Sequence, residues 1–257
     1  LYMAGADGFD ADAASRQHRA LHRAVSEVLP AVCFAGDPST PDALFPNNVF
    51  GSASGRYIVG RMRHAVRQRE AGRDDIRHFF ADVLGLDEID LSAQHEPCEL
   101  TGSLVIDRSR GLGFAGLSER CSEQGARLMH DAFGLRATLM FDLAPGEYHT
   151  NVVLAVLAGR AALLCPDGFA DAAVAQAIAE LYSPHAVLLG APEKAAFAAN
   201  AIALSDDSVW MSRGAAGALT AENRSRIAGA GFTLRHVDMD AIEAAGGSLR
   251  CCIGEIY

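Results

Sequence analysis

The sequence predicts an α/β fold, because short apolar strands alternate with amphipathic helices along most of its 257 residues. From Glu99 onward, the order strand, strand, helix, strand recurs at about 40 to 50 residues, a period that is typical of radial or repeat architectures. No linker rich in proline or serine, low-complexity tract or block of like charges marks a domain boundary. We therefore expect residues 1–257 to form a single domain.

The elements before Glu99 are predicted from hydrophobic periodicity and from turn-forming residues. Leu21, Val25 and Val28 share one face of a helix expected near the start of the chain. Turn-forming residues fill the segment 36–42 and indicate a loop. The predicted elements are a helix at 12–29, a strand at 30–35, a loop and strand pair at 45–51 and 55–59, and a second amphipathic helix at 67–84.

The elements after Glu99 follow the repeating order. Small and polar residues at 109–111 and 158–160 indicate turns between paired strands. The predicted elements are strands at 103–107, 112–117, 136–141, 151–157, 161–165 and 186–189, helices at 119–133 and 169–182, and a continuing alternation through 194–200, 208–212, 218–228 and 233–237.

Composition excludes several classes of protein. The net charge of -10 argues against a nucleic-acid-binding surface, which is normally basic. No apolar run approaches the roughly 20 residues that span a bilayer, and the first five residues do not look like a signal peptide. The six cysteines are scattered without framework spacing, as reduced thiols are in a cytosolic protein. We therefore expect a cytoplasmic protein that binds neither nucleic acid nor membrane.

A pair of cysteines stands near the end of the chain. Cys251 and Cys252 follow the small-residue bend Gly-Gly-Ser-Leu-Arg at 246–250, which suits a nucleophile held rigidly in a pocket. No Cys-x-x-Cys accompanies them, so we expect no zinc site. Thiolate chemistry also needs a base, and the segment Tyr-His-Thr-Asn offers one in His149. For isolated cysteines alone, burial as small apolar side chains is the commoner explanation.

Four segments together resemble the guanidine-group-modifying superfamily, whose fold is called the pentein fold. They are Pro-Asp-Ala-Leu-Phe-Pro-Asn-Asn at 41–48, Glu-Leu-Thr-Gly-Ser at 99–103, Tyr-His-Thr-Asn at 148–151 and Gly-Gly-Ser-Leu-Arg-Cys at 246–251. They occur in the order of the family and span nearly the whole chain. The wording looks most similar to the amidinotransferase-like branch that is associated with citrulline hydrolysis. The resemblance implies a five-bladed α/β propeller with pseudo-fivefold symmetry.

The resemblance also implies the catalytic residues. Cys251 matches the nucleophile, His149 the general acid and base, and Glu99 the carboxylate that holds the planar nitrogen group of the substrate. A guanidino or ureido carbon is a poor electrophile, so a thiolate attacks it better than water does. The imidazole then protonates the leaving amine and activates the water that hydrolyses the thiol adduct.

Further positions match residues that bind a small amino-acid substrate. Asp42, with Asn47 and Asn48 of the first motif, corresponds to residues lining the pocket. Arg67 and Arg120 match positions that bind the α-carboxylate of the substrate. The residues themselves leave another reading open, in which Arg67 is a surface charge paired with Glu70 or Asp74.

Two positions depart from members that process arginine. Asn48 and Asn151 stand where those members usually have carboxylates, and an uncharged amide suits a neutral ureido group better than a guanidinium cation. We therefore expect a citrulline-type ureidohydrolase that yields ornithine, ammonia and carbon dioxide. Leu100 is a third departure, since a small residue is usual after Glu99 in the family.

Other functions remain open from the sequence. They are an arginine deiminase or dimethylarginine hydrolase, an amidinotransferase with the same residues, and a non-catalytic pentein. In each enzymatic case we expect no cofactor and no metal. We also expect a homodimer, because dimers are common among the relatives.

Overall fold

The computed structural model describes residues 9–257, so the first five residues discussed above lie outside the described part of the chain. These residues form two compact units, each assembled from separate stretches of sequence. The first unit contains the residues up to Cys33, Val152–Asp167 and Ala172–Cys252, and the second contains Phe34–Asn151, Gly168–Asp171 and Ile253–Tyr257.

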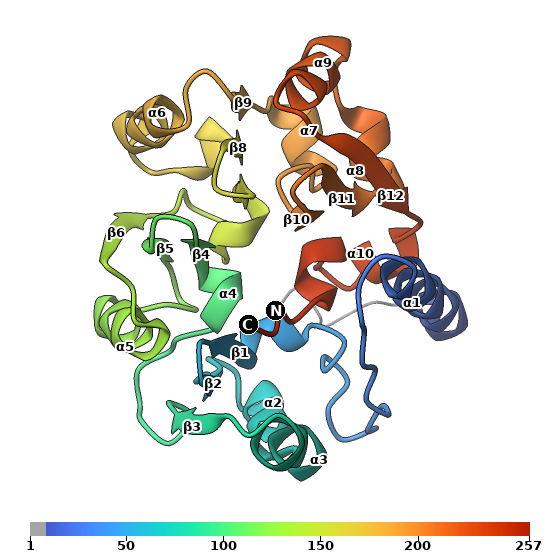
Figure 1. The fold of residues 1–257 in the computed structure, drawn as a ribbon, viewed down its shortest axis with the longest axis vertical. Helices are drawn as coiled ribbons and strands as arrows, with labels where there is room; N and C mark the ends of the chain where they lie inside the picture. The colour runs from blue at the N-terminus through green and yellow to red at the C-terminus, as the bar shows by residue number, and fades with distance from the viewer. Residues whose placement is uncertain (1–8) are drawn as a thin grey trace. The chain divides into compact units, whose positions relative to one another are not determined.

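Four three-stranded sheets share one plan. In each, an antiparallel hairpin is followed by a helical crossover and a third strand that pairs in parallel with the second. This is the strand, strand, helix, strand order that the sequence predicts, and the mixed α/β class is confirmed (Figure 1). The described residues contain four such sheets, none of them closed, so a fifth blade is not shown.

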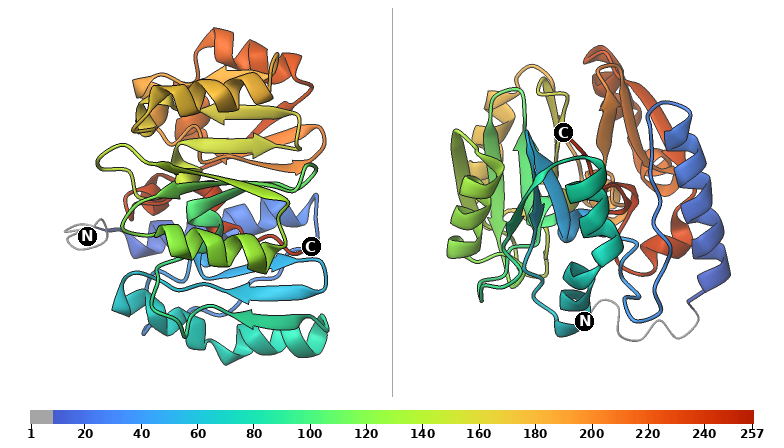
Figure 2. Two further views of the ribbon diagram at one scale, coloured as in Figure 1. Left: turned by 90° about the vertical axis from the view of Figure 1, so that its left-hand side faces the viewer. Right: turned by 60° about the horizontal axis from the view of Figure 1, so that its bottom comes forward.

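The second unit contains two of these sheets. Their strands are β1 (Phe50–Ala53), β2 (Arg56–Val59) and β3 (Asp87–Asp90), and β4 (Leu104–Asp107), β5 (Leu112–Leu117) and β6 (Ala137–Asp142). The helical segments are η1 (Pro46–Asn48), α2 (Ala65–Gln68), η2 (Arg69–Gly72), α3 (Asp74–His78), η3 (Phe79–Val83), α4 (Leu100–Ser103) and α5 (Glu123–Phe133). Helix α5 begins after the cap Ser122, whose hydroxyl accepts from the N–H of Gly125, and it lies against β5 and β6 (Figure 2).

The core of the second unit fixes the residues around the candidate site. Cys98 and Cys121 face each other in an isolated antiparallel bridge within a buried cluster that also contains Leu104 and Met129. Burial raises the pKa of the Cys98 thiol to about 11 and that of Cys121 to about 12, so both stay protonated. Their chain neighbours Glu99 and Arg120 are thereby held on a rigid support.

The first unit contains the other two sheets. Their strands are β7 (Leu154–Leu157), β8 (Ala161–Leu164) and β9 (Ala186–Leu188), and β10 (Ile202–Ser205), β11 (Ser208–Ser212) and β12 (Thr233–Val237). The helical segments are α1 (Ala11–Ser26), α6 (Ala172–Leu181), α7 (Ala191–Ala195), α8 (Arg213–Ala218), α9 (Ala221–Gly229), α10 (Asp240–Glu243) and η6 (Leu249–Cys252). Two short segments, η4 (Thr150–Val152) and η5 (Pro166–Gly168), each have residues in both units. Helix α1 packs on α10, and Leu21 and Val25 of the expected apolar face are buried, whereas Val28 lies beyond the end of the helix and is exposed.

Several local predictions are wrong. Residues 30–35 form no strand, because Pro30 and Val32 are exposed and no described strand pairs with this segment. The helix expected at 67–84 is broken, since Arg73 has extended backbone angles after the 3₁₀ segment that ends at Gly72. Strands β3 and β10 were not expected: β3 is mostly charged and exposed, and β10 has only four residues, with a register shift between Ala203 and Ser205. No helix of residues 9–257 is long and apolar enough to cross a membrane.

Candidate active site

The second unit brings together all but one of the predicted site residues. Each is at most 5% exposed, although all of them are charged or polar, and such side chains are rarely buried without a function or a partner. These residues are Asp42, Asn47, Asn48, Arg67, Glu99, Arg120, His149 and Asn151. Cys251 belongs to the first unit.

Glu99 is the centre of this buried group. Its Oε2 lies 2.7 Å from Nε2 of His149, and its Oε1 accepts a 2.9 Å hydrogen bond from the backbone N–H of Arg63. Nη1 of Arg120 lies 3.4 Å from both carboxylate oxygens. Because a carboxylate only accepts, Nε2 of His149 carries the hydrogen and Nδ1 is left as an acceptor. One carboxylate thus orients the imidazole and balances the charge of Arg120.

The charge states of Glu99 and His149 follow from their surroundings. Burial alone would raise the pKa of Glu99, but the hydrogen bond and charge of His149 and the charges of Arg120 and Arg67 outweigh it and lower it to about 2. Burial lowers the pKa of His149 below its usual value, and Glu99 opposes this only in part. At neutral pH the pair is an ionised carboxylate and a neutral imidazole. A neutral imidazole is the form that accepts a proton as a general base.

We expect the free energy of unfolding to decrease in two steps as the pH is lowered. Because the pKa of His149 is lowered, the unfolded chain binds its proton more readily, so stability is lost as pH falls below 6.5. The slope for one such group is at most about 1.4 kcal/mol per pH unit. Because the pKa of Glu99 is lowered, its contribution is present above 4.5 and is lost as pH falls from there to about 2. Urea unfolding between about pH 5 and pH 8 measures the first step.

A pair of histidine variants isolates the contribution of His149. His149→Gln should flatten the dependence of stability on pH below 6.5, because the residue that resists protonation is gone. The same substitution at His78, whose side chain is 74% exposed, should leave the wild-type dependence in place. Identical pH profiles for the two variants would show that His149 is not buried as a neutral imidazole.

The turn after Glu99 places the backbone against two side chains of the site. Leu100, where the resemblance led us to expect a small residue, has a φ of 20°, at the edge of the left-handed region, where large side chains are disfavoured. It is fully buried in the core with Leu104, so the added side chain supports the turn. Gly102 follows, and a Cβ there would clash with Oδ1 of Asn48 and lie 3.0 Å from ring atoms of His149. The absence of a side chain at Gly102 therefore makes room for both groups.

Asn47 and Asn48 present buried amide groups that other described residues do not satisfy. Neither polar atom of the Asn47 side chain has a hydrogen-bond partner within residues 9–257, and the same is true of Oδ1 of Asn48. Asn47 is fully buried and Asn48 is 2% exposed. An unpaired buried polar group costs about 1–3 kcal/mol, so its presence calls for an explanation such as a ligand. The backbone is held in place, because Thr101 donates to the carbonyl of Asn47 at 3.1 Å.

Asn151 and the residue before it join this turn to the segment that carries His149. The Asn151 side chain donates to the carbonyl of Thr101 at 3.2 Å. Thr150 donates to the carbonyl of Ser103 at 2.6 Å and accepts from the N–H of Gly116 at 2.8 Å. His149 lies in the loop before η4 rather than at the start of a strand, since β7 begins only at Leu154. These bonds fix the position of the imidazole.

Arg67 is buried and paired, so the reading as a surface charge is wrong. Its Nε and one Nη donate to the two carboxylate oxygens of Glu70, both at 2.8 Å, and the same Nη donates to the carbonyls of Asp42 and Phe45. Burial raises the pKa of Glu70 and of Asp42, and the charge of Arg67 opposes both shifts. Binding of a substrate carboxylate by Arg67 or Arg120 stays a prediction, because both guanidinium groups have carboxylate partners in this structure.

Cys251 occupies a tight turn of the first unit. It lies in η6 and is 2% exposed, and its backbone N–H donates to the carbonyl of Ser248 at 3.1 Å. Nδ2 of Asn200, a fully buried residue, lies 3.2 Å from its sulfur. Burial raises the pKa of the neighbouring Cys252 well above its usual value, so Cys252 stays a thiol. Of the two cysteines, Cys251 is therefore the better candidate for the nucleophile.

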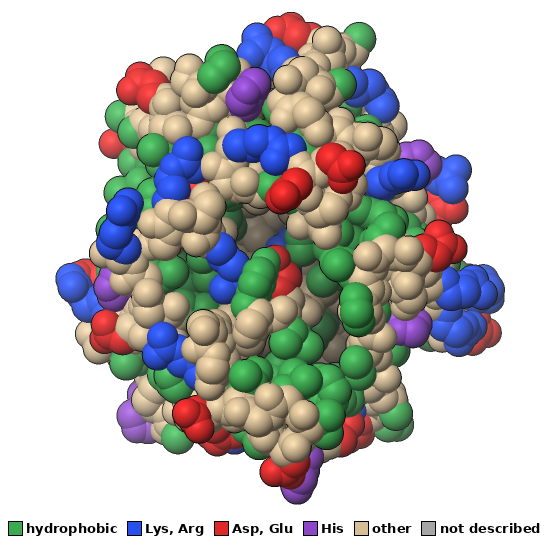
Figure 3. Space-filling view, viewed as in Figure 1, with side chains coloured by type: hydrophobic (Ala, Val, Ile, Leu, Met, Phe, Trp, Pro, Cys, Tyr) green, Lys and Arg blue, Asp and Glu red, His purple; other side chains and the backbone are tan. Residues whose placement is uncertain are grey.

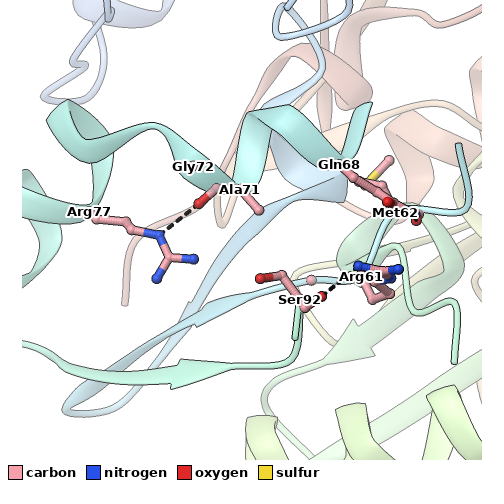
Figure 4. A pocket seen from close by; sticks show the side chains of 8 residues that line it. Arg61, Met62, Gln68, Ala71, Gly72, Arg77 and Ser92 are labelled. Atoms are coloured by element: carbon pink, nitrogen blue, oxygen red, sulfur yellow. Dashed lines mark hydrogen bonds between the residues drawn. The ribbon is translucent and has the colours of Figure 1, made fainter. Parts of the chain in front are cut away.

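A cavity of about 220 Å³ also lies in the second unit (Figure 4). Arg61, Met62, Gln68, Arg77 and Ser92 contribute to its lining, and no predicted site residue does. The two arginines bond to protein groups there, Arg61 to the carbonyl of Ser92 and Arg77 to the carbonyl of Ala71. The cavity is thus separate from the buried group around Glu99.

On the molecular face shown in Figure 3, basic and acidic side chains both occur.

For three residues, the sequence did not indicate the contacts that tie them to the site. Glu70 is three residues after Arg67, and that spacing indicates a pair but not its burial. Gly102 belongs to the second motif, yet nothing in the sequence says which side chains approach it. Asn200 precedes β10 in a segment of small residues and carries no motif, so its contact with Cys251 had no signal in the sequence.

The fold matches solved penteins whose names refer to arginine-type substrates. The N-terminal domain of ArgZ, an arginine dihydrolase from the ornithine–ammonia cycle in cyanobacteria, matches as a substrate-bound mutant. The TM-score is 0.85 at 20% identity, over 98% of this chain and 89% of that one. An apo structure of ArgZ matches with a TM-score of 0.85 at 21% identity, and this chain covers 38% of that chain. A dimethylarginine dimethylaminohydrolase carrying an S-methyl-L-thiocitrulline adduct matches with a TM-score of 0.74 at 20% identity, over 95% of this chain and 88% of that one. At such identities the likeness establishes the fold.

The protein is thus a pentein-type α/β protein. A comparison with curated proteins gave no match. Residues 11–257 match the model of the family described as N,N dimethylarginine dimethylhydrolase, eukaryotic, and the chain belongs to that family. The superfamily expected from the four motifs is confirmed, and the chain is a hydrolase of the class that acts on C–N amidino bonds. The amidinotransferase and non-catalytic alternatives are therefore set aside.

Proposed function

We propose that the chain is a cysteine-dependent hydrolase of the ureido or guanidino end of an arginine-type amino acid, with citrulline as its preferred substrate. The observation that carries the preference is the set of three buried amide atoms without a partner among the described residues, Nδ2 and Oδ1 of Asn47 and Oδ1 of Asn48. A ureido group is neutral and contains both N–H donors and a carbonyl acceptor, and an amide can pair with either. A guanidinium offers donors only and gains most from carboxylates. The carboxylate of Glu99 is already balanced by Arg120.

The chemistry assigns one role to each catalytic residue. Neutral His149 takes the proton of the Cys251 thiol, and the thiolate attacks the ureido carbon. The imidazolium returns the proton to the leaving nitrogen, so ammonia departs and a thiocarbamate adduct remains. His149 then takes a proton from water, which attacks the adduct and restores the thiol. The carbamate that is released breaks down to ornithine and carbon dioxide.

Hydrolysis of arginine or of a methylated arginine is the second candidate. The family match favours it, because the family is described as dimethylarginine hydrolases. The ionised Glu99 also supports it, since a buried carboxylate attracts a cation. The two candidates use the same nucleophile and base, and they differ in the charge of the group that the pocket receives.

Product release from three substrates distinguishes the two candidate functions. Ammonia is measured with citrulline, arginine and N,N-dimethylarginine, and dimethylamine is measured as well with N,N-dimethylarginine. We expect release from citrulline to be fastest, to vanish in Cys251→Ser, and to persist in Cys252→Ser, the matched variant of the neighbouring thiol. Faster turnover of arginine than of citrulline would overturn the preference but keep the enzyme class. Activity that survives Cys251→Ser would overturn the nucleophile.

Asn48→Asp tests the charge argument directly. A carboxylate of nearly the same shape should weaken the binding of a neutral ureido group and strengthen the binding of a guanidinium cation. We expect the ratio of kcat/KM for arginine to that for citrulline to rise at least about tenfold. An unchanged ratio would show that Asn48 does not set the preference.

The finer structural expectations stay proposals. We propose a five-bladed propeller formed by a single domain of residues 1–257, and the four sheets of one plan support four of its repeats. A homodimer and a cytoplasmic location are also proposed. Light scattering on the purified protein tests the dimer.

A further inference from the structure

Asn200 holds Cys251 by both ends of its side-chain amide. Nδ2 donates to the sulfur at 3.2 Å, and Oδ1 accepts from the backbone N–H of Cys251 at 3.4 Å. Asn200 is fully buried, and Cys251 is 2% exposed. Two contacts from one planar group restrict both the position of the backbone and the rotamer of the thiol. Alanine or leucine could fill this space but could make neither contact.

The segment that carries Asn200 is built as a rigid support. Asn200 lies in the segment between α7 and β10, two elements labelled in Figure 1. Its N–H donates to the carbonyl of Phe197 at 2.8 Å. Phe197 has a φ of 60°, a left-handed conformation that is strained for a large side chain. Strain of this kind persists only where the surroundings enforce it, and it is concentrated at functional sites.

The surroundings that enforce this turn centre on Glu193 of α7. This carboxylate is 3% exposed and accepts hydrogen bonds from the N–H of Gly190 at 2.7 Å and the N–H of Thr220 at 2.9 Å. The side chain of Asn223 donates to it at 2.9 Å. The carbonyl of Glu193 accepts from the N–H of Ala198, which fixes the start of the turn that leads to Asn200.

A donor at this sulfur matters most when the sulfur is charged. Hydrogen bonds to charged groups are about twice as strong as those between neutral groups. The donor therefore favours the thiolate over the thiol, and the thiolate is the nucleophilic form. A purely structural asparagine would stabilise the turn equally in both forms.

We propose that Asn200 is a positioning residue of the reaction, which holds the sulfur of Cys251 in the attacking rotamer and stabilises its thiolate through the Nδ2–H donor. The inference rests on the proposed role of Cys251 as the nucleophile. It assigns a role in the reaction to Asn200, a residue that lies outside the four sequence motifs.

The test measures the thiol itself, without substrate. The rate of alkylation of Cys251 by iodoacetamide is followed as a function of pH, with peptide mapping to identify the modified cysteine. Asn200→Asp keeps the size of the side chain but replaces the donor by an acceptor. We expect its alkylation at neutral pH to be at least about tenfold slower, because the sulfur then faces an acceptor instead of the Nδ2–H donor. Asn200→Ala serves if the aspartate variant does not fold.

Asn223→Ala is the matched control. Asn223 is 7% exposed and supports the same turn through Glu193, but it does not contact Cys251. We expect it to lower the melting temperature while leaving the alkylation profile of Cys251 in place. A folded Asn200 variant with the wild-type profile, or an equal shift in Asn223→Ala, would overturn the inference. Failure of the proposed role of Cys251 as the nucleophile would be recognised separately, because activity would then survive in Cys251→Ser.

Discussion

Glu99→Gln is expected to cost about 3 kcal/mol of stability and at least about a hundredfold in kcat/KM. The stability is lost because Arg120, 1% exposed, keeps its charge while its fully buried carboxylate partner becomes neutral. The activity is lost because an amide can donate as well as accept, so Nε2 of His149 is no longer required to carry the hydrogen. Urea unfolding at neutral pH and steady-state kinetics on the best substrate measure the two effects.

Glu119→Gln provides the matched control for this prediction. Glu119 binds the same guanidinium, with its Oε1 at 3.1 Å from Nε of Arg120, but its side chain is 55% exposed. Water replaces much of a lost exposed interaction, so this variant should lose less than about 1 kcal/mol. Similar losses in the two variants would mean that burial of Glu99 does not govern the energy of the pair.

Gly102→Ala is expected to remove most of the activity, by about a hundredfold or more. The new Cβ would overlap Oδ1 of Asn48 and press on the ring of His149 at 3.0 Å, on the side that includes Nδ1. Both side chains are almost fully buried, so neither can swing into solvent to avoid it. We expect kcat to fall more than stability, because the displaced groups belong to the site. Kinetics and thermal unfolding of the same preparation test this.

Gly217→Ala is the control for the effect of adding a methyl group to a glycine. Gly217 lies in α8, and a Cβ there would meet no atom within 4 Å. Alanine is favoured over glycine in a helix, so this variant should be more stable by about 0.5–1 kcal/mol and fully active. Wild-type kinetics in Gly102→Ala would show that the close approach of Gly102 to Asn48 and His149 has no catalytic role.

The order of elements was readable from the sequence where apolar residues keep a regular spacing. The strands predicted at 112–117 and 208–212 are found at those positions. Each is the central strand of its sheet, between an antiparallel and a parallel neighbour, and is therefore mostly buried and apolar. Strand β3, with three of its four residues exposed, gave no such pattern. The helix expected at 67–84 failed because periodicity does not report a backbone break at Gly72 and Arg73.

The candidate site shows the same division. The motifs located Glu99 and His149, and the structure places them 2.7 Å apart although 50 residues separate them. The sequence could not say that Arg67 is buried against Glu70, because an i, i+3 pair reads the same on a surface as in a core. It also could not find Asn200, whose contact with Cys251 spans 51 residues without a motif.

The sequence by itself determined the repeating strand, strand, helix, strand order, the superfamily and the chemical types of the site residues. Each of these depends on local spacing or on short motifs, which are written in consecutive residues. Only the tertiary structure decided the charge states of Glu99 and His149, the room left by Gly102 and the support that Asn200 gives to Cys251. Those properties depend on burial and on contacts between distant segments, and desolvation acts only once the chain has folded around the charged groups.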